Sequence, residues 1–143
     1  MNTLRLTKLD TILDNGQTVH YCYDEEGDLL EITFRKARAT CAVELTESII
    51  LRFDLEKEEP LSLSFISYSR LAQPTEVGPR SFRLKLDSMD DEVRQKVLRI
   101  ITSSPVNQFL KVSSYTRPRA RTSEPITYIE RLPVLALDQG QIA

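Results

Sequence analysis

Four carboxylates lie close together in one short segment of this sequence. Asp24, Glu25 and Glu26 are consecutive, and Asp28 follows them after a single glycine. Hard cations such as calcium bind several oxygen ligands, so these residue types suit a metal-binding loop. The spacing does not match the twelve-residue calcium loop, however, and acidic residues with a glycine are also what a solvated hairpin turn requires. We therefore predict a hairpin turn here, with no bound metal.

Cysteine, histidine and paired glutamates offer three further kinds of chemistry. Cys22, Cys41 and the single His20 match no zinc-binding spacing, and both cysteines are predicted to be reduced, half-buried side chains on strands. Glu44 and Glu47 have opposite parity on one predicted strand, which makes them a poor general acid and base pair. No nucleophile motif is present, and the four glycines are too scattered for a phosphate-binding loop. We expect no cofactor and no enzymatic activity.

The most concentrated basic segment spans residues 111–121. Its candidate partner-binding residues are Lys111, Tyr115, Arg117, Arg119 and Arg121. Basic side chains can follow a phosphate backbone while an aromatic ring stacks on a base, which is typical of non-specific nucleic-acid binding. Four charges are few in a chain of net charge −2, and exposed arginines also pair with acidic protein surfaces. Weak nucleic-acid binding is therefore the alternative hypothesis, and protein binding is the leading one.

The charge distribution also indicates an oriented protein contact. Residues 10–60 carry 13 acidic and 5 basic side chains, whereas residues 61–143 carry 8 acidic and 12 basic ones. Complementary fields of this kind steer encounters between proteins more than they add affinity. The partner predicted from this asymmetry is another protein or a second copy of the same chain.

Strand signals dominate the first part of the chain. Apolar and polar residues alternate with a period of two in the segments 19–23, 30–34, 43–53, 61–65 and 82–86. The segment 43–53 is predicted to be one long strand with one wet face. Asn15-Gly16 and the link 24–28 have the turn residues expected between antiparallel neighbours. Residues 4–13 also fit a helical stripe, but the turn that follows them favours a first strand.

One helix is predicted at about residues 88–103. Apolar residues recur there at spacings of three and four, Ser88 and Asp91 resemble a capping box, and Pro105 prevents continuation. Residues 69–80 form the predicted connector before the helical half. After the helix, Val106, Leu110 and Val112 indicate a strand, 115–125 a polar loop and 126–131 a last strand.

Together these signals predict an α+β fold, in which an antiparallel β-meander of about six strands has one amphipathic helix packed on one face. With 41% hydrophobic and 28% charged residues, the chain suits one domain, predicted at 1–132, followed by a loosely held tail at 133–143. Within that domain, 81–131 is a predicted strand–helix–strand extension. We expect no membrane span, no signal peptide and a cytoplasmic location.

Part of the sequence resembles the domain of unknown function 2283 family, a group of small bacterial and archaeal proteins. The matching positions are Tyr23, Asp24, Asp28, Leu30, Ile32 and Glu44, followed by strands at 49–54 and 61–66. The resemblance covers about residues 18–72, and residues 58–62 stand where the family has a glycine-containing turn. It implies a compact β-meander with no established biochemical role, and some members look like antitoxin-type partners of small proteins.

The leading functional hypothesis is a non-catalytic protein-binding or regulatory module, with self-association among its modes. The edge strands of a meander carry unpaired backbone groups, which another chain can use. The alternative is weak nucleic-acid binding through residues 111–121.

Overall fold

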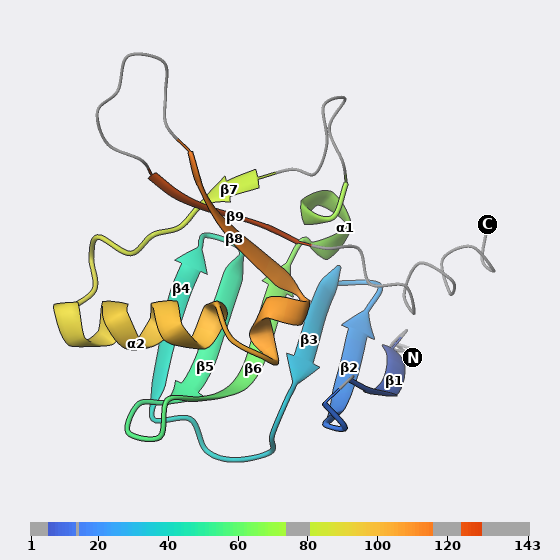
Figure 1. Ribbon diagram of the computed structural model, residues 1–143. Coiled ribbons are helices and arrows are strands. Elements are labelled where there is room, and N and C mark those ends of the chain that lie inside the picture. The colour runs from blue at the N-terminus through green and yellow to red at the C-terminus, as the bar shows by residue number, and fades with distance from the viewer. Residues whose placement is uncertain (1–5, 14, 74–80, 116–123, 130–143) are drawn as a thin grey trace.

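The computed structural model describes residues 6–13, 15–73, 81–115 and 124–129 (Figure 1). Its main feature is one antiparallel sheet of six strands in the order β1-β2-β3-β6-β5-β4. The strands are β1 (Leu6–Ile12), β2 (Thr18–Asp24), β3 (Leu29–Thr33), β4 (Cys41–Thr46), β5 (Ile49–Asp54) and β6 (Glu59–Ile66). The predicted α+β class with a mainly antiparallel sheet is therefore confirmed, and residues 6–12 form a strand rather than a helix.

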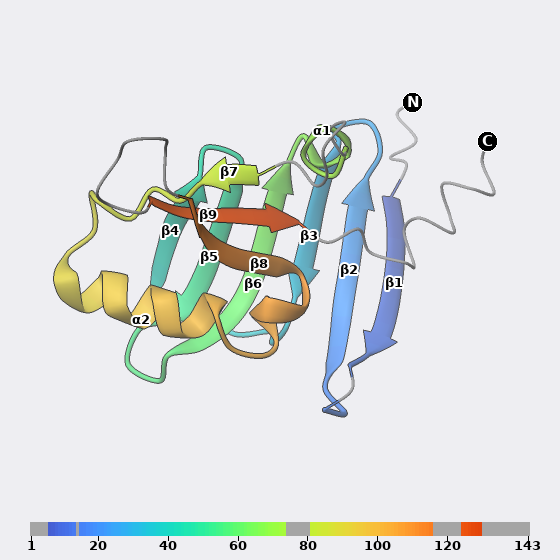
Figure 2. The ribbon, with the colours of Figure 1, turned by 45° about the horizontal axis from the view of Figure 1, so that its top comes forward.

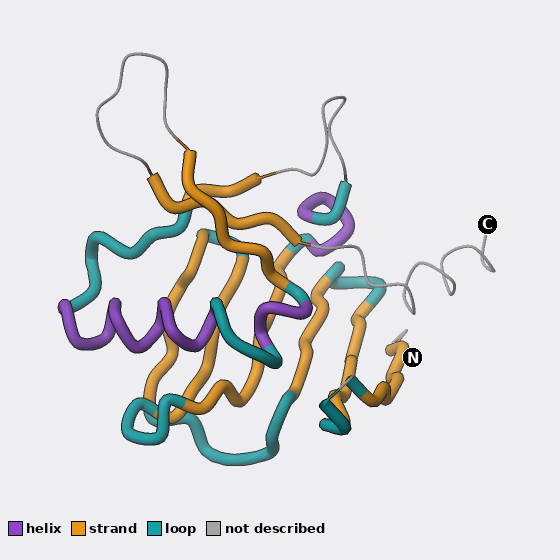
Figure 3. Tube along the Cα trace, viewed as in Figure 1, coloured by secondary structure: helices purple, strands orange, loops and turns teal. Residues whose placement is uncertain are grey.

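The sheet consists of two three-stranded meanders rather than the single meander that was predicted. β3 pairs with β6, so the loop 34–40 passes the ends of β6 and β5 before β4 begins (Figure 3). The loop is held by hydrogen bonds from the Phe34 amide to the Leu61 carbonyl and from the Thr40 amide to the Phe53 carbonyl. Alternation in a sequence identifies strands but not their neighbours, so this crossing left no signal.

The predicted long strand 43–53 is instead a hairpin of two strands. β4 and β5 are joined at Glu47-Ser48, and Val43 lies opposite Leu51. The register shifts between Glu44 and Thr46, which is a β-bulge. Because a strand that folds back on itself in this register keeps odd-numbered residues on one face, the alternation continues through the turn.

A second layer lies over part of the sheet (Figures 1 and 2). It contains a small antiparallel sheet in the order β7-β9-β8 and the helix α2. Its elements are β7 (Ser81–Arg83), α2 (Asp91–Ile101), the 3-10 helix η1 (Val106–Gln108), β8 (Leu110–Tyr115) and β9 (Glu124–Ile129). Figure 2 shows α2 and this small sheet over β4, β5 and β6, whereas β1 and β2 extend beyond them.

The helix α2 is shorter than predicted. It begins after Asp90 and ends before Thr102, and the N-cap makes no side-chain hydrogen bond, so the predicted Ser88–Asp91 capping box is wrong. The Met89 amide instead donates to the Leu86 carbonyl, which forms a turn where the first predicted helical residues lie. Two other short helices were not predicted, η1 and α1 (Tyr68–Leu71).

One hydrophobic cluster joins the two layers. Val97, Ile100 and Ile101 of α2 are buried in the same cluster as the inward-facing residues of the large sheet. From the second layer, the Phe109 ring contacts Tyr21 and Phe34, with centroids 6.0 and 5.7 Å apart. Beyond β7, residues 84–86 continue without strand pairing, and the Lys85 amide donates to the Leu45 carbonyl at the β4 edge.

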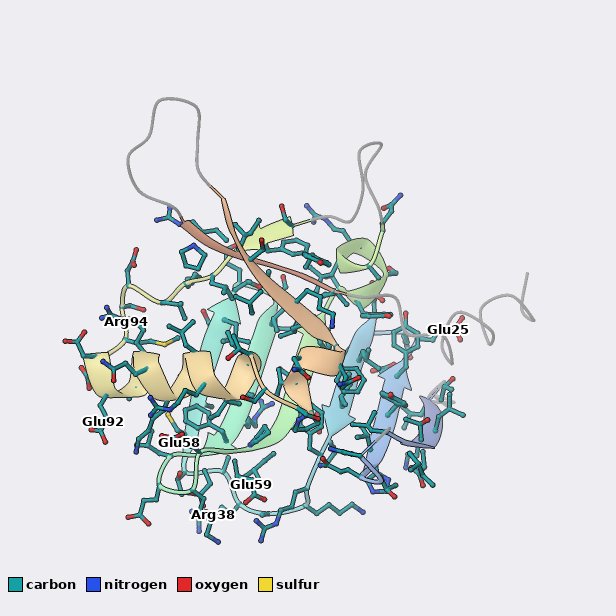
Figure 4. All side chains as sticks on the ribbon, in the orientation of Figure 1. Glu25, Arg38, Glu58, Glu59, Glu92 and Arg94 are labelled. Carbon is teal, nitrogen blue, oxygen red and sulfur yellow. The ribbon has the colours of Figure 1, made fainter. Side chains whose placement is uncertain are left out.

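Two hairpin loops of the large sheet have the same construction. Asp24 accepts a hydrogen bond from the Gly27 amide, and Asp54 accepts one from the Lys57 amide, each from three residues ahead. Each loop ends on a residue of positive φ, 52° at Asp28 and 51° at Glu58. Glu58 thus adopts a backbone conformation that favours glycine. Its carboxylate, labelled in Figure 4, binds the Arg99 guanidinium of α2, with distances of 2.5 and 3.0 Å.

The Asn15-Gly16 turn connects β1 to β2, as predicted. Gly16 has a positive φ, 85°, and its amide donates to the Leu13 carbonyl. The predicted tail 133–143, most of the loop 115–125 and residues 74–80 of the connector lie outside the described residues.

Candidate functional site

The acidic link between β2 and β3 is a structural junction. The Asp28 carboxylate accepts hydrogen bonds from the Tyr23 hydroxyl at 2.7 Å, the Ser69 hydroxyl at 2.6 Å and the Ser69 amide at 3.0 Å. It thereby ties the hairpin to α1. In the described part of the chain, no three His, Cys, Asp or Glu side chains gather as metal ligands.

These contacts shift the ionisation of both partners. Partial burial raises the pKa of Asp28, but the hydrogen bonds from Ser69 and Tyr23 outweigh it, so this pKa lies below its usual value. Burial and the hydrogen bond to Asp28 raise the pKa of the Tyr23 hydroxyl. Asp28 is therefore charged and Tyr23 neutral at physiological pH.

We expect Asp28→Asn to lower the free energy of unfolding by about 1 kcal/mol at neutral pH, because hydrogen bonds to a charged acceptor are lost in a partly exposed site. Asparagine tolerates the positive φ, so backbone strain does not contribute. Since the folded-state pKa of Asp28 is lowered, its contribution is present above the unfolded value of about 3.9 and is lost as the pH falls through the folded value. Urea unfolding at several pH values measures this.

Glu26→Gln is the matched control, because Glu26 is an exposed carboxylate in the same turn. A difference between wild type and Asp28→Asn that stays constant down to strongly acidic pH would contradict the assignment.

A basic groove of about 530 Å³ opens where the two layers meet. Its lining comes from the β4–β5 turn (46–48), the region of α1 (67–71) and β7 with the residues after it (81–85). These elements lie at the same end of the large sheet in Figure 1. The groove therefore brings together three segments that are far apart in the sequence.

Three cations and four hydroxyl side chains line this groove, with Glu47 as its acidic member. Lys85 lies 3.3 Å from Glu44, and Arg83 lies 3.6 Å from Asp87. Both pairs are largely exposed, and exposed pairs contribute little to stability, so they can exchange for an incoming anion. Arg70 is exposed, and no carboxylate of the described residues pairs with it. The hydroxyls of Ser48, Ser67, Ser81 and Thr46 can donate to the same anion.

Sequence patterns did not identify this groove. No sequence motif contains Arg70, Arg83 or Lys85. Only the excess of basic residues after position 61 indicates a positive surface. Of the predicted basic segment, the structure describes the Lys111 side chain, whose ammonium donates to the Asn107 carbonyl at 2.8 Å and closes η1. Residues 116–123, with Arg117, Arg119 and Arg121, lie outside the described residues, as does the side chain of Tyr115.

The other candidate chemical groups are dispersed. Cys22 and Cys41 are half-buried free thiols on β2 and β4, and the His20 ring lies 2.6 Å from Asp10 of the neighbouring strand. Glu44 and Glu47 are separated by the β4 bulge, with Glu44 bound to Lys85 and Glu47 at the groove. Within the described residues, neither of these two glutamates forms an acid and base pair with His20.

No protein-family model, curated protein or solved structure matches this chain. The resemblance to the 2283 family remains a prediction. Among the described residues, no helix has the length and apolar character needed to cross a membrane.

Proposed function

We propose that this protein is a non-catalytic binding module that acts by contacting another protein, and that the basic groove receives an acidic segment of that partner. The observation that carries the proposal is the position of Arg70, a guanidinium without a carboxylate partner among the described residues, at a groove that also holds Arg83 and Lys85. A guanidinium binds carboxylates through two parallel hydrogen bonds, which gives such a contact orientation as well as strength.

An acidic protein segment suits this surface better than a nucleic acid does. Many other cations of the described residues already bind neighbouring carboxylates, and these are Arg35, Arg94, Lys96 and Arg99. Arg70, Arg83 and Lys85 instead meet at one compact groove, which differs from the long basic track that a phosphate backbone requires. Leu71 and Phe82 add apolar lining, which favours a peptide with mixed side chains.

The basic segment 111–121 supplies a second contact in this proposal. The residues assigned to it are Lys111, Tyr115, Arg117, Arg119 and Arg121. The amphipathic helix α2 is part of the scaffold, packed on the face of the large sheet. The resemblance to the 2283 family favours a small neighbouring protein as the partner. A cytoplasmic location of the protein is part of the same proposal.

We expect Arg70→Glu to weaken binding of a glutamate-rich peptide about tenfold or more, because it puts a carboxylate against the incoming carboxylates. Fluorescence anisotropy with a labelled peptide measures the affinity, and a glutamine-rich peptide of the same length tests for charge dependence. Arg38→Glu is the matched control, since Arg38 is exposed in the loop 34–40 away from the groove (Figure 4).

Equal affinities for the two peptides, or equal losses in the two variants, would remove the groove from the proposal. The triple variant Arg117→Glu, Arg119→Glu, Arg121→Glu tests the second contact in the same assay. Oligonucleotide binding that is tighter than peptide binding and falls steeply with salt would favour nucleic acid instead.

A further inference from the structure

The two edges of the large sheet differ. At the β4 edge, the Leu45 carbonyl accepts a hydrogen bond from the Lys85 amide of the second layer. At the other edge, β1 pairs only with β2, and no strand of the described residues lies on its outer side. Figure 2 shows β1 beyond the second layer. An edge strand of seven residues, with no outer neighbour among the described residues, is a template for pairing with another chain.

The register of the β1–β2 hairpin shows which backbone groups face this edge. The Leu13 amide donates to the Gln17 carbonyl across the hairpin, at 2.8 Å. Backbone groups in an antiparallel pair alternate in direction, so those of Thr7, Leu9 and Thr11 point to β2. The outward-pointing groups belong to Leu6, Lys8, Asp10 and Ile12.

The sequence of β1 is complementary to itself about Leu9. When two copies are paired antiparallel with Leu9 opposite Leu9, Lys8 lies opposite Asp10 and Leu6 lies opposite Ile12. Each of these pairs joins two residues whose backbone groups point outward, so the register is compatible with a regular ladder. The same register pairs opposite charges twice across the twofold axis, which stabilises a cross-strand contact.

The side chains of these residues are available for such a contact. Leu6 and Ile12 are 42% and 72% exposed, and they are two of the four large apolar residues that are exposed among those described. Asp10 binds His20 through Oδ1, which leaves Oδ2 for a second donor. Lys8 is exposed, and no carboxylate of the described residues pairs with it.

We propose that β1 pairs with β1 of a second copy of the chain, antiparallel and centred on Leu9, so that the two large sheets continue into each other. This inference extends the proposed function by naming one partner, and it involves a surface different from the groove. Isologous pairing of this kind closes as a dimer and exposes no further edge at β1.

The test uses two charge variants, Lys8→Asp and Asp10→Lys, with native mass spectrometry and sedimentation velocity. Each variant alone places like charges opposite each other, and we expect the dissociation constant of its dimer to be about tenfold or more above that of wild type. A mixture of the two restores both opposite-charge pairs, so heterodimers are expected in it. The double variant Lys8→Asp, Asp10→Lys is expected to dimerise again.

Lys8→Pro, measured beside Lys8→Ala, separates edge pairing from charge, since both substitutions remove the ammonium of Lys8. Its amide faces outward, so proline removes an edge donor without costing a bond to β2, and circular dichroism verifies the fold. We expect this variant to be monomeric, while Lys36→Asp in the exposed loop 34–40 stays dimeric. A wild-type chain that is monomeric at all concentrations overturns the proposal, as does a mixture that gives no heterodimers. Arg70→Glu is expected to leave the dimer intact, so this proposal and that for the groove fail separately.

Discussion

Replacement of Phe65 by alanine is expected to lower the free energy of unfolding by about 3–5 kcal/mol, because it opens a cavity in the centre of the large sheet. The Phe65 side chain is fully buried on β6 and lies between Leu30 of β3 and Ile49 of β5. Its ring also contacts Tyr68 of α1, with centroids 6.1 Å apart. Phe65 thus connects the two meanders at the strands where they join. Urea unfolding followed by circular dichroism measures the change.

The next residue provides the control. Ile66 lies on the same strand but points to the open face, where it is 41% exposed. We expect Ile66→Ala to lower the free energy of unfolding by less than about 1 kcal/mol. If the two variants are destabilised equally, the predicted orientation of β6 is wrong.

Phe109→Ala is also expected to lower the free energy of unfolding by about 3–5 kcal/mol. Here the loss of stability should fall mainly on the second layer. Phe109 is 2% exposed and contacts Tyr21 and Phe34 of the large sheet from the second layer. Its loss removes aromatic contacts between the layers, so the second layer should open at a lower free energy than the sheet. Hydrogen exchange is expected to show reduced protection in α2 and β8, with less change in β5 and β6.

Gln108→Ala is the control for this experiment, since Gln108 is exposed one residue earlier in η1. Protection that falls uniformly in both layers after Phe109→Ala would show that they unfold as one unit.

Periodicity predicted strand positions well and strand connections poorly. The alternating segments at 19–23, 30–34 and 61–65 each lie in or overlap a strand of the large sheet. The prediction of one long strand at 43–53 is wrong because a hairpin with this register leaves the alternation unbroken, so one long strand and two short ones have the same pattern. Where β3 pairs with β6, the order depends on contacts between residues far apart in the sequence, which a local pattern does not record.

The candidate site was less accessible to prediction, for the same reason. The spacing of the carboxylates at 24–28 marks them as a chemical group, but a residue that orients Asp28 is Ser69, 41 residues away. Arg70 and Arg83 come together only because α1 and β7 meet at one end of the large sheet. Charge counting detected the positive excess of the second half, but not the surface on which it is concentrated.

The division of the large sheet into two meanders gives it an approximate rotational symmetry. A half-turn about an axis through the sheet, between β3 and β6, exchanges β2 with β5 and β1 with β4. The matching loops that end at Asp28 and Glu58 occupy equivalent places in the two halves. The second layer does not obey this symmetry, because it lies over β4, β5 and β6 (Figure 2). Two edges that this symmetry would make equivalent therefore differ, since β4 is hydrogen-bonded to the second layer and no strand of the described residues pairs with the outer side of β1.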